Sequence, residues 1–127
     1  YWAAAHAARS QMIATLLATP PELVRTASPA ERARVDAILM GMLPIERRSR
    51  GMLNDARLAG APFLADVSQI GAPTLVISVE DDLFGTAATA RRLAGQIPNA
   101  RLLMLRDGGH VWVGRDAEVW SAVAAFV

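Results

Sequence analysis

Two short polar stretches near the carboxyl end of the sequence carry the residue types that acid–base catalysis requires. Glu80, Asp81 and Asp82 follow one apolar run, and His110 follows the next apolar run along the chain. A carboxylate that accepts a hydrogen bond from one imidazole nitrogen fixes the tautomer of the ring and stabilises its cation, which leaves the other nitrogen free as a base. An acid from the first stretch paired with His110 would therefore make a general base.

Each stretch also has an ordinary structural explanation. An acidic triplet after a strand is often a solvated turn or a helix cap, and a single histidine is more often structural than catalytic. Gly108 and Gly109 allow backbone angles that are closed to other residues, so the chain can bend sharply just before His110. That bend could be a plain turn or could aim the ring into a site, and the joint placement of acids and histidine favours the site.

Both stretches lie at the ends of predicted strands. Residues 74–79 (TLVISV) are a short apolar, β-branched run typical of a strand buried on both faces, and residues 101–105 (RLLML) form a second strand. A helix capped by Thr86 and ending near Ile97 separates them, and this succession predicts a parallel βαβ unit. Sites in open α/β sheets lie at the carboxyl ends of the strands, so both loops open on the same edge.

The first half of the sequence predicts helices instead. Ser28 caps one of them, with Glu31 three residues later as in a capping box. Proline and glycine mark the helix ends. We expect helices over residues 1–19, 29–43 and 45–58, and a last helix from near Asp116.

The composition changes near residue 65, which divides the chain into a helical segment (1–65) and an α/β segment (66–127). Two parallel strands do not make a stable sheet by themselves, because both faces and both edges need cover. Further strands must come from elsewhere, and the sequence begins with Tyr rather than Met. We therefore expect this chain to be part of a longer protein.

Residues 71–112 (GAPTLVISVEDDLFGTAATARRLAGQIPNARLLMLRDGGHVW) resemble the C-terminal part of the α/β-hydrolase superfamily, in which a strand of the type PTLVI ends in an acid and a later strand ends in Gly-His. The resemblance implies that Asp82, with Asp81 as runner-up, is the acid of a catalytic triad and that His110 is its base. It also implies a partial α/β-hydrolase fold, in which the helical segment 1–65 is the variable cap and precedes a βαβ unit and a C-terminal helix.

The nucleophile of such a triad is not recognisable in this sequence. The family places it in the motif G-x-S-x-G, and none of the six serines has that context. Because the family's serine precedes the acid and the histidine, we expect the nucleophile upstream of this chain. The resemblance then implies hydrolysis of an ester or related acyl bond by a Ser-Asp-His triad. The alternatives are an Asp-nucleophile enzyme acting on epoxides or halides, a relative that cleaves carbon–carbon bonds, and a non-catalytic scaffold.

Substrate contacts are predicted near the histidine and on the helices. Trp112 is a candidate substrate-binding residue, with burial in the core as an equal alternative. Several apolar positions on the helices suggest a pocket for an uncharged, largely apolar group, although for any one of them packing of the helices is the favoured alternative; they are Met12, Ile13, Leu16, Ile38, Leu39 and Met42.

Composition excludes several other classes of protein. The net charge of +1 and the scattered basic residues argue against nucleic acid, and no apolar run or signal peptide indicates a membrane, so we expect a cytoplasmic protein. The absence of Cys and Lys excludes thiolate and Schiff-base chemistry and argues against a receiver domain, which needs a late lysine.

A metal site is a further alternative, but its candidate ligands lack a recognised metal-ligand spacing; they are Asp81, Asp82, Asp107 and His110. We expect no metal or cofactor; the expected partners are a small-molecule substrate and the N-terminal half of the same hydrolase.

Overall fold

The computed structural model describes residues 2–42, 47–60 and 65–127. Helices come first, followed by a single βαβ unit and a last helix: α1 (Trp2–Leu16), α2 (Pro21–Thr26), α3 (Pro29–Gly41), α4 (Ser49–Ala59), the 3₁₀ turn η2 (Val67–Gln69), β1 (Thr74–Val79), α5 (Ala87–Gln96), β2 (Ala100–Leu105) and α6 (Asp116–Ala124). None of the helices in these ranges is both long and apolar enough to span a membrane. This order of helices, βαβ unit and last helix agrees with the predicted partial α/β fold.

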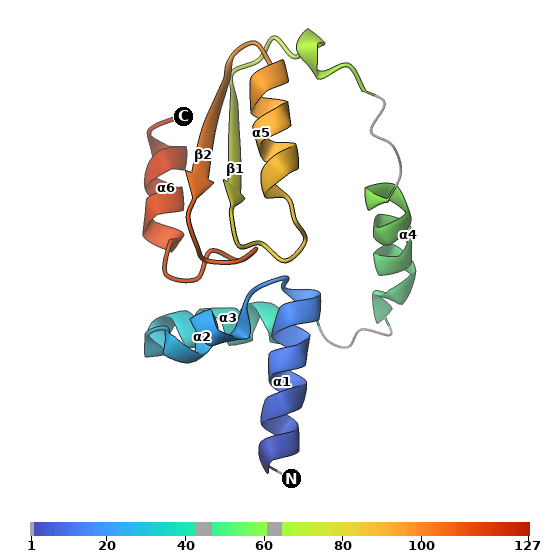
Figure 1. Ribbon diagram of the computed structural model, residues 1–127, viewed down its shortest axis with the longest axis vertical. Helices are drawn as coiled ribbons and strands as arrows, with labels where there is room; N and C mark the ends of the chain where they lie inside the picture. The colour runs from blue at the N-terminus through green and yellow to red at the C-terminus, as the bar shows by residue number, and fades with distance from the viewer. Residues whose placement is uncertain (1, 43–46, 61–64) are drawn as a thin grey trace.

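The two strands pair in parallel, as predicted, with Thr74 opposite Ala100 and Val79 opposite Leu105. Helix α5 packs on both strands, and α6 lies on the other side of the pair (Figure 1). The strands run toward the helical segment, so the loops at their carboxyl ends face α1, α2 and α3 (Figure 1). The prediction that β1 is buried on both faces is wrong for the described residues, because only its last two residues are buried and the other four are half-buried.

The helical segment differs from the prediction at its element ends. Helix α1 ends at Leu16, three residues early, and the short α2, which was not predicted, begins with a proline in its first turn. The Ser28 hydroxyl accepts from the Glu31 amide at 3.2 Å, which confirms the predicted cap of α3. Helix α4 begins at Ser49, and the predicted start near Ile45 lies outside the described residues.

Two apolar clusters form the core. One joins the strands to α6 through Val79, Leu105 and Val119. The other fills the space among α1, α2 and α3, and it includes Val113 from the loop after His110. All six helical positions predicted as a substrate pocket belong to this second cluster or pack against it, which supports the packing alternative for them: Met12, Ile13, Leu16, Ile38, Leu39 and Met42.

Candidate active site

Asp82 and His110 lie in contact at the carboxyl ends of the two strands. The distance between His110 Nδ1 and Asp82 Oδ2 is 2.9 Å, as expected for an acid and a histidine on neighbouring parallel strands. The Asp82 side chain is 3% exposed and that of His110 is 46% exposed. The Phe84 ring meets the imidazole edge to face, with centroids 5.0 Å apart. One side of the imidazole is therefore held by a buried carboxylate, and the rest of the ring remains accessible.

The three consecutive acids after β1 have three different partners. Glu80 pairs with Arg91 of α5. Asp81 accepts hydrogen bonds from the backbone amides of Gly109, at 2.8 Å, and Gly108, at 3.4 Å. Only Asp82 of the three reaches the imidazole in the described structure, so the geometry favours Asp82 over the alternative, Asp81.

Hydrogen bonds hold the Asp82 carboxylate in place, and one of them comes from Thr86, which the sequence predicted as a helix cap. Its carboxylate accepts from the Phe84 amide at 2.8 Å and from the Thr86 hydroxyl, which also lies 2.9 Å from Ser78 Oγ. Thr86 stands at the N-cap of α5 but makes no side-chain cap bond, because its hydroxyl is directed to Asp82. Burial raises the pKa of Asp82, but hydrogen bonds from His110, Thr86 and the Phe84 amide outweigh it and lower the pKa below its ordinary value.

The lowered pKa of Asp82 predicts a loss of stability in acid. A carboxyl whose pKa is lower in the folded than in the unfolded protein stabilises the fold above the unfolded pKa, about 3.9, and loses that contribution as the pH falls through the folded pKa. We expect the difference in unfolding free energy between the wild type and Asp82→Asn to shrink as the pH is lowered from 6 to 3. Chemical denaturation across this range measures it, and a difference that is constant with pH would contradict the hydrogen-bond network around Asp82.

At the bend before His110, the backbone packs closely against the segment that follows α1. Gly109 has φ +62°, and a Cβ built there would lie 2.6 Å from Thr19 Cγ2 and 2.8 Å from Thr19 Cα. The carbonyl of Ala18 accepts from the His110 amide at 3.3 Å and from the Leu83 amide at 2.9 Å. Ala18 and Thr19 are fully buried, so the helical segment joins the histidine loop to the acid loop. Sequence patterns gave no signal for this contact.

We expect Gly109→Ala to destabilise the protein far more than Gly85→Ala. Both glycines have a positive φ, +62° and +68°, but nothing lies within 4 Å of a Cβ built at Gly85. The control should lose about 1 kcal/mol from the backbone angle alone, and Gly109→Ala about 1–3 kcal/mol more from the clash with Thr19. Denaturation curves give both values. Equal losses would show that the close contact with Thr19 is not made in solution.

One hollow borders His110, and a second borders the acid loop after Asp82. One, of about 200 Å³, is lined by Arg34, Ile38, His110, Val111 and Trp112. Trp112 also packs against the cluster of the strands and α6, so it borders the histidine and joins the core at once. The other, of about 670 Å³, lies among α1, α4 and the acid loop; its lining is mainly apolar and includes Leu16, Met42, Met52 and Phe84.

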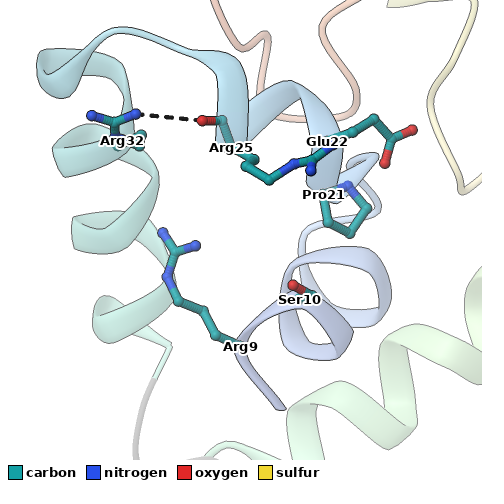
Figure 2. Close-up of a pocket in the computed structure, with 6 residues that line it drawn as sticks. All are labelled: Arg9, Ser10, Pro21, Glu22, Arg25 and Arg32. Carbon is teal, nitrogen blue, oxygen red and sulfur yellow. Dashed lines mark hydrogen bonds between the residues drawn. The ribbon is translucent and has the colours of Figure 1, made fainter. Parts of the chain in front are cut away.

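A third cavity, of about 470 Å³, lies among α1, α2 and α3 and away from the acid and histidine loops (Figure 2). Its lining is partly polar and includes Arg9, which pairs with Asp36, and Arg32, which donates to the Arg25 carbonyl. Among the side chains that the structure describes, no three of the metal-binding types are grouped closely enough to hold an ion. Asp107 is paired with Arg115 at 2.7 Å.

Comparison with known proteins adds three relatives, each named "Putative carbamate hydrolase RutD". The chain is 36% identical over 66 residues to the protein of Klebsiella pneumoniae, 44% over 46 residues to that of Pseudomonas syringae and 34% over 59 residues to that of Stutzerimonas stutzeri. The matches cover 52%, 36% and 46% of this chain, but only 25%, 18% and 22% of the relatives. The similar region is thus a quarter or less of each relative. No family model and no solved structure matches.

Proposed function

We propose that this chain supplies the acid and the base of a serine-type α/β-hydrolase that cleaves an ester or a related acyl bond. The observation that carries the proposal is the contact between the buried Asp82 carboxylate and Nδ1 of the accessible His110 ring. The names of the three relatives add a carbamate as a specific form of acyl bond. In this proposal the nucleophilic serine comes from residues outside this chain.

The proposed reaction proceeds in two stages. The serine oxygen attacks the substrate carbonyl while His110 Nε2 takes the serine proton, and Asp82 stabilises the imidazolium that forms. The tetrahedral adduct collapses, the bond to the leaving group breaks, and His110 gives its proton to that group. His110 then takes a proton from water, which attacks the acyl- or carbamoyl-enzyme, and returns the proton to the serine as the acid is released. The Asp82–His110 contact leaves Nε2 as the nitrogen that can carry out each transfer.

The proposed substrate lies between the helical segment and the two loops. The hollow beside the acid loop is large enough for a small organic group, and its lining by Leu16, Met42 and Phe84 suits an uncharged, largely apolar one. Trp112 would contact the substrate from the smaller hollow beside His110. The helical segment would thus act as the cap, and the absence of cysteine fits the reducing cytoplasm as the place of the reaction.

Hydrolysis of matched substrates by the complete protein tests this proposal. An aryl ester and an aryl carbamate with the same phenol leaving group should both release the phenol, and both rates should depend on His110. An epoxide and an alkyl halide should remain unchanged. Turnover of the epoxide or halide alone would replace the serine mechanism by an Asp nucleophile, and a folded protein inert toward all four compounds would favour the non-catalytic scaffold.

A further inference from the structure

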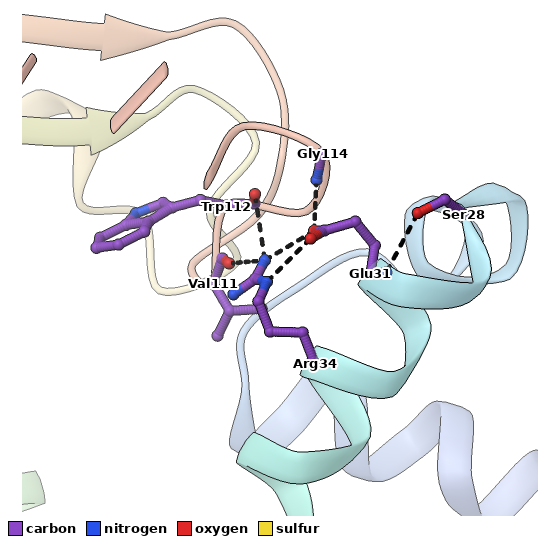
Figure 3. Close-up of polar contacts among 6 residues, drawn as sticks. All are labelled: Ser28, Glu31, Arg34, Val111, Trp112 and Gly114. Carbon is purple, nitrogen blue, oxygen red and sulfur yellow. Dashed lines mark hydrogen bonds and ion pairs between the residues drawn. The ribbon is translucent and has the colours of Figure 1, made fainter. Parts of the chain in front are cut away.

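Two side chains of helix α3 form hydrogen bonds with the backbone immediately after His110. Arg34 Nη2 donates to the carbonyl of Val111 at 2.8 Å and to that of Trp112 at 3.4 Å. Glu31 Oε2 accepts from the amide of Gly114 at 2.9 Å. Figure 3 shows that the two side chains reach from one face of α3 to the turn. Three backbone groups in four consecutive residues are therefore bound by one pair of side chains.

Arg34 and Glu31 form a two-pronged ion pair. Arg34 Nε lies 3.1 Å from Glu31 Oε1 and Arg34 Nη2 lies 2.9 Å from Glu31 Oε2, which is the two-pronged geometry that only a guanidinium offers. The hydrogen bond from Arg34, followed by that from the Gly114 amide, lowers the pKa of Glu31, so the pair stays charged at neutral pH. Nε and Nη2 of the guanidinium are engaged by a carboxylate and two carbonyls, so this edge of the Arg34 side chain is committed to the turn.

The turn that this pair holds is under strain. Trp112 has φ +59°, an angle that bulky residues avoid and that persists only where surrounding contacts impose it. Next to it Val113 is buried in the cluster of α1, α2 and α3, so the turn is anchored to the helices by an apolar side chain as well as by the ion pair. The half-exposed His110 ring has fewer restraints of its own: the Asp82 carboxylate and the Phe84 ring.

We propose that Glu31 and Arg34 are positioning residues for the base, holding the turn after His110 so that its ring stays against Asp82 during turnover. This inference rests on the proposed function, in which His110 transfers the protons. The two residues act through the backbone and do not touch the reacting atoms. The cap-like segment then carries part of the apparatus that orients the base, in addition to covering the substrate.

Arg34→Lys in the complete protein, with Arg32→Lys as the matched control, tests the proposal. Lysine keeps the charge but cannot bond Glu31 and two carbonyls together. Arg32 lies on the same helix, and among the described residues its side chain donates to the Arg25 carbonyl rather than to the turn after His110. We expect kcat of Arg34→Lys for the aryl ester to fall about 10- to 100-fold, the loss that follows a small misplacement of a reacting group, with KM little changed. Glu31→Gln, which keeps an oxygen for the Gly114 amide, should lower kcat less but in the same direction.

A second readout does not depend on activity. The Nδ1 proton of a histidine bonded to a buried carboxylate gives a far-downfield proton NMR signal, and we expect Arg34→Lys to weaken or broaden it while Arg32→Lys preserves it. If the wild type hydrolyses none of the acyl substrates, the proposed function fails and this signal still decides the positioning role. An unchanged signal with unchanged kcat in both Arg34→Lys and Glu31→Gln would overturn the proposal. A raised KM at constant kcat would overturn it too, in favour of substrate binding by Arg34.

Discussion

Replacing His110 by alanine is expected to reduce kcat of the complete protein by about 10⁵- to 10⁶-fold, the scale of loss seen when the base of a triad is removed. Without the imidazole, no group takes the proton of the attacking serine or returns one to the leaving group. KM should change much less, because the larger hollow beside the acid loop is not lined by His110. Steady-state hydrolysis of the aryl ester measures both constants.

His6→Ala is the matched control, because His6 is the other histidine of the sequence. We expect its kcat to equal that of the wild type. A His110→Ala enzyme that retains more than about a tenth of wild-type kcat would remove His110 from the mechanism, provided that its denaturation curve shows a folded protein.

Asp82→Asn is expected to lower kcat by about 10⁴-fold, because an amide at this position favours the wrong imidazole tautomer and no longer stabilises the imidazolium. The matched control is Asp81→Asn in the adjacent position. Asp81 holds the amides of Gly108 and Gly109 rather than the ring, so its variant should lose stability and only a modest part of kcat. Measuring kcat and the midpoint of thermal unfolding for both variants separates the two roles. A larger loss of kcat in Asp81→Asn than in Asp82→Asn would reverse the assignment.

The parts of the fold that local sequence determines were predictable. The β-branched run of β1, the cap at Ser28 and the start of α6 at Asp116 each depend on neighbouring residues, and the structure confirms them. The contact between an acid and His110 was predictable too, because the carboxyl ends of parallel strands lie at the same edge of a sheet. The choice between Asp81 and Asp82 did not, because two adjacent side chains in a loop differ only in direction, and that direction is set by contacts with the glycine loop.

The contacts between the helical segment and the histidine loop could not be read from the sequence. Ala18 binds through its carbonyl, a group that every residue has, and the pattern of Glu31 and Arg34 is that of an ordinary ion pair one turn apart on a helix. Glu31 was predicted as part of a capping box, and its amide does bond to Ser28, but its carboxylate turns to Arg34 and Gly114 instead. Such roles arise only when segments far apart in the chain meet.

Covalent labelling of the complete protein with a fluorophosphonate probe tests the proposed serine mechanism most directly. The probe reacts with a serine only when a base activates it, and mass spectrometry of the labelled peptides locates the site. We expect one modified serine outside these 127 residues, with labelling lost in His110→Ala and kept in His6→Ala. A folded protein that is not labelled, or that is labelled equally well without His110, would contradict a triad built on Asp82 and His110.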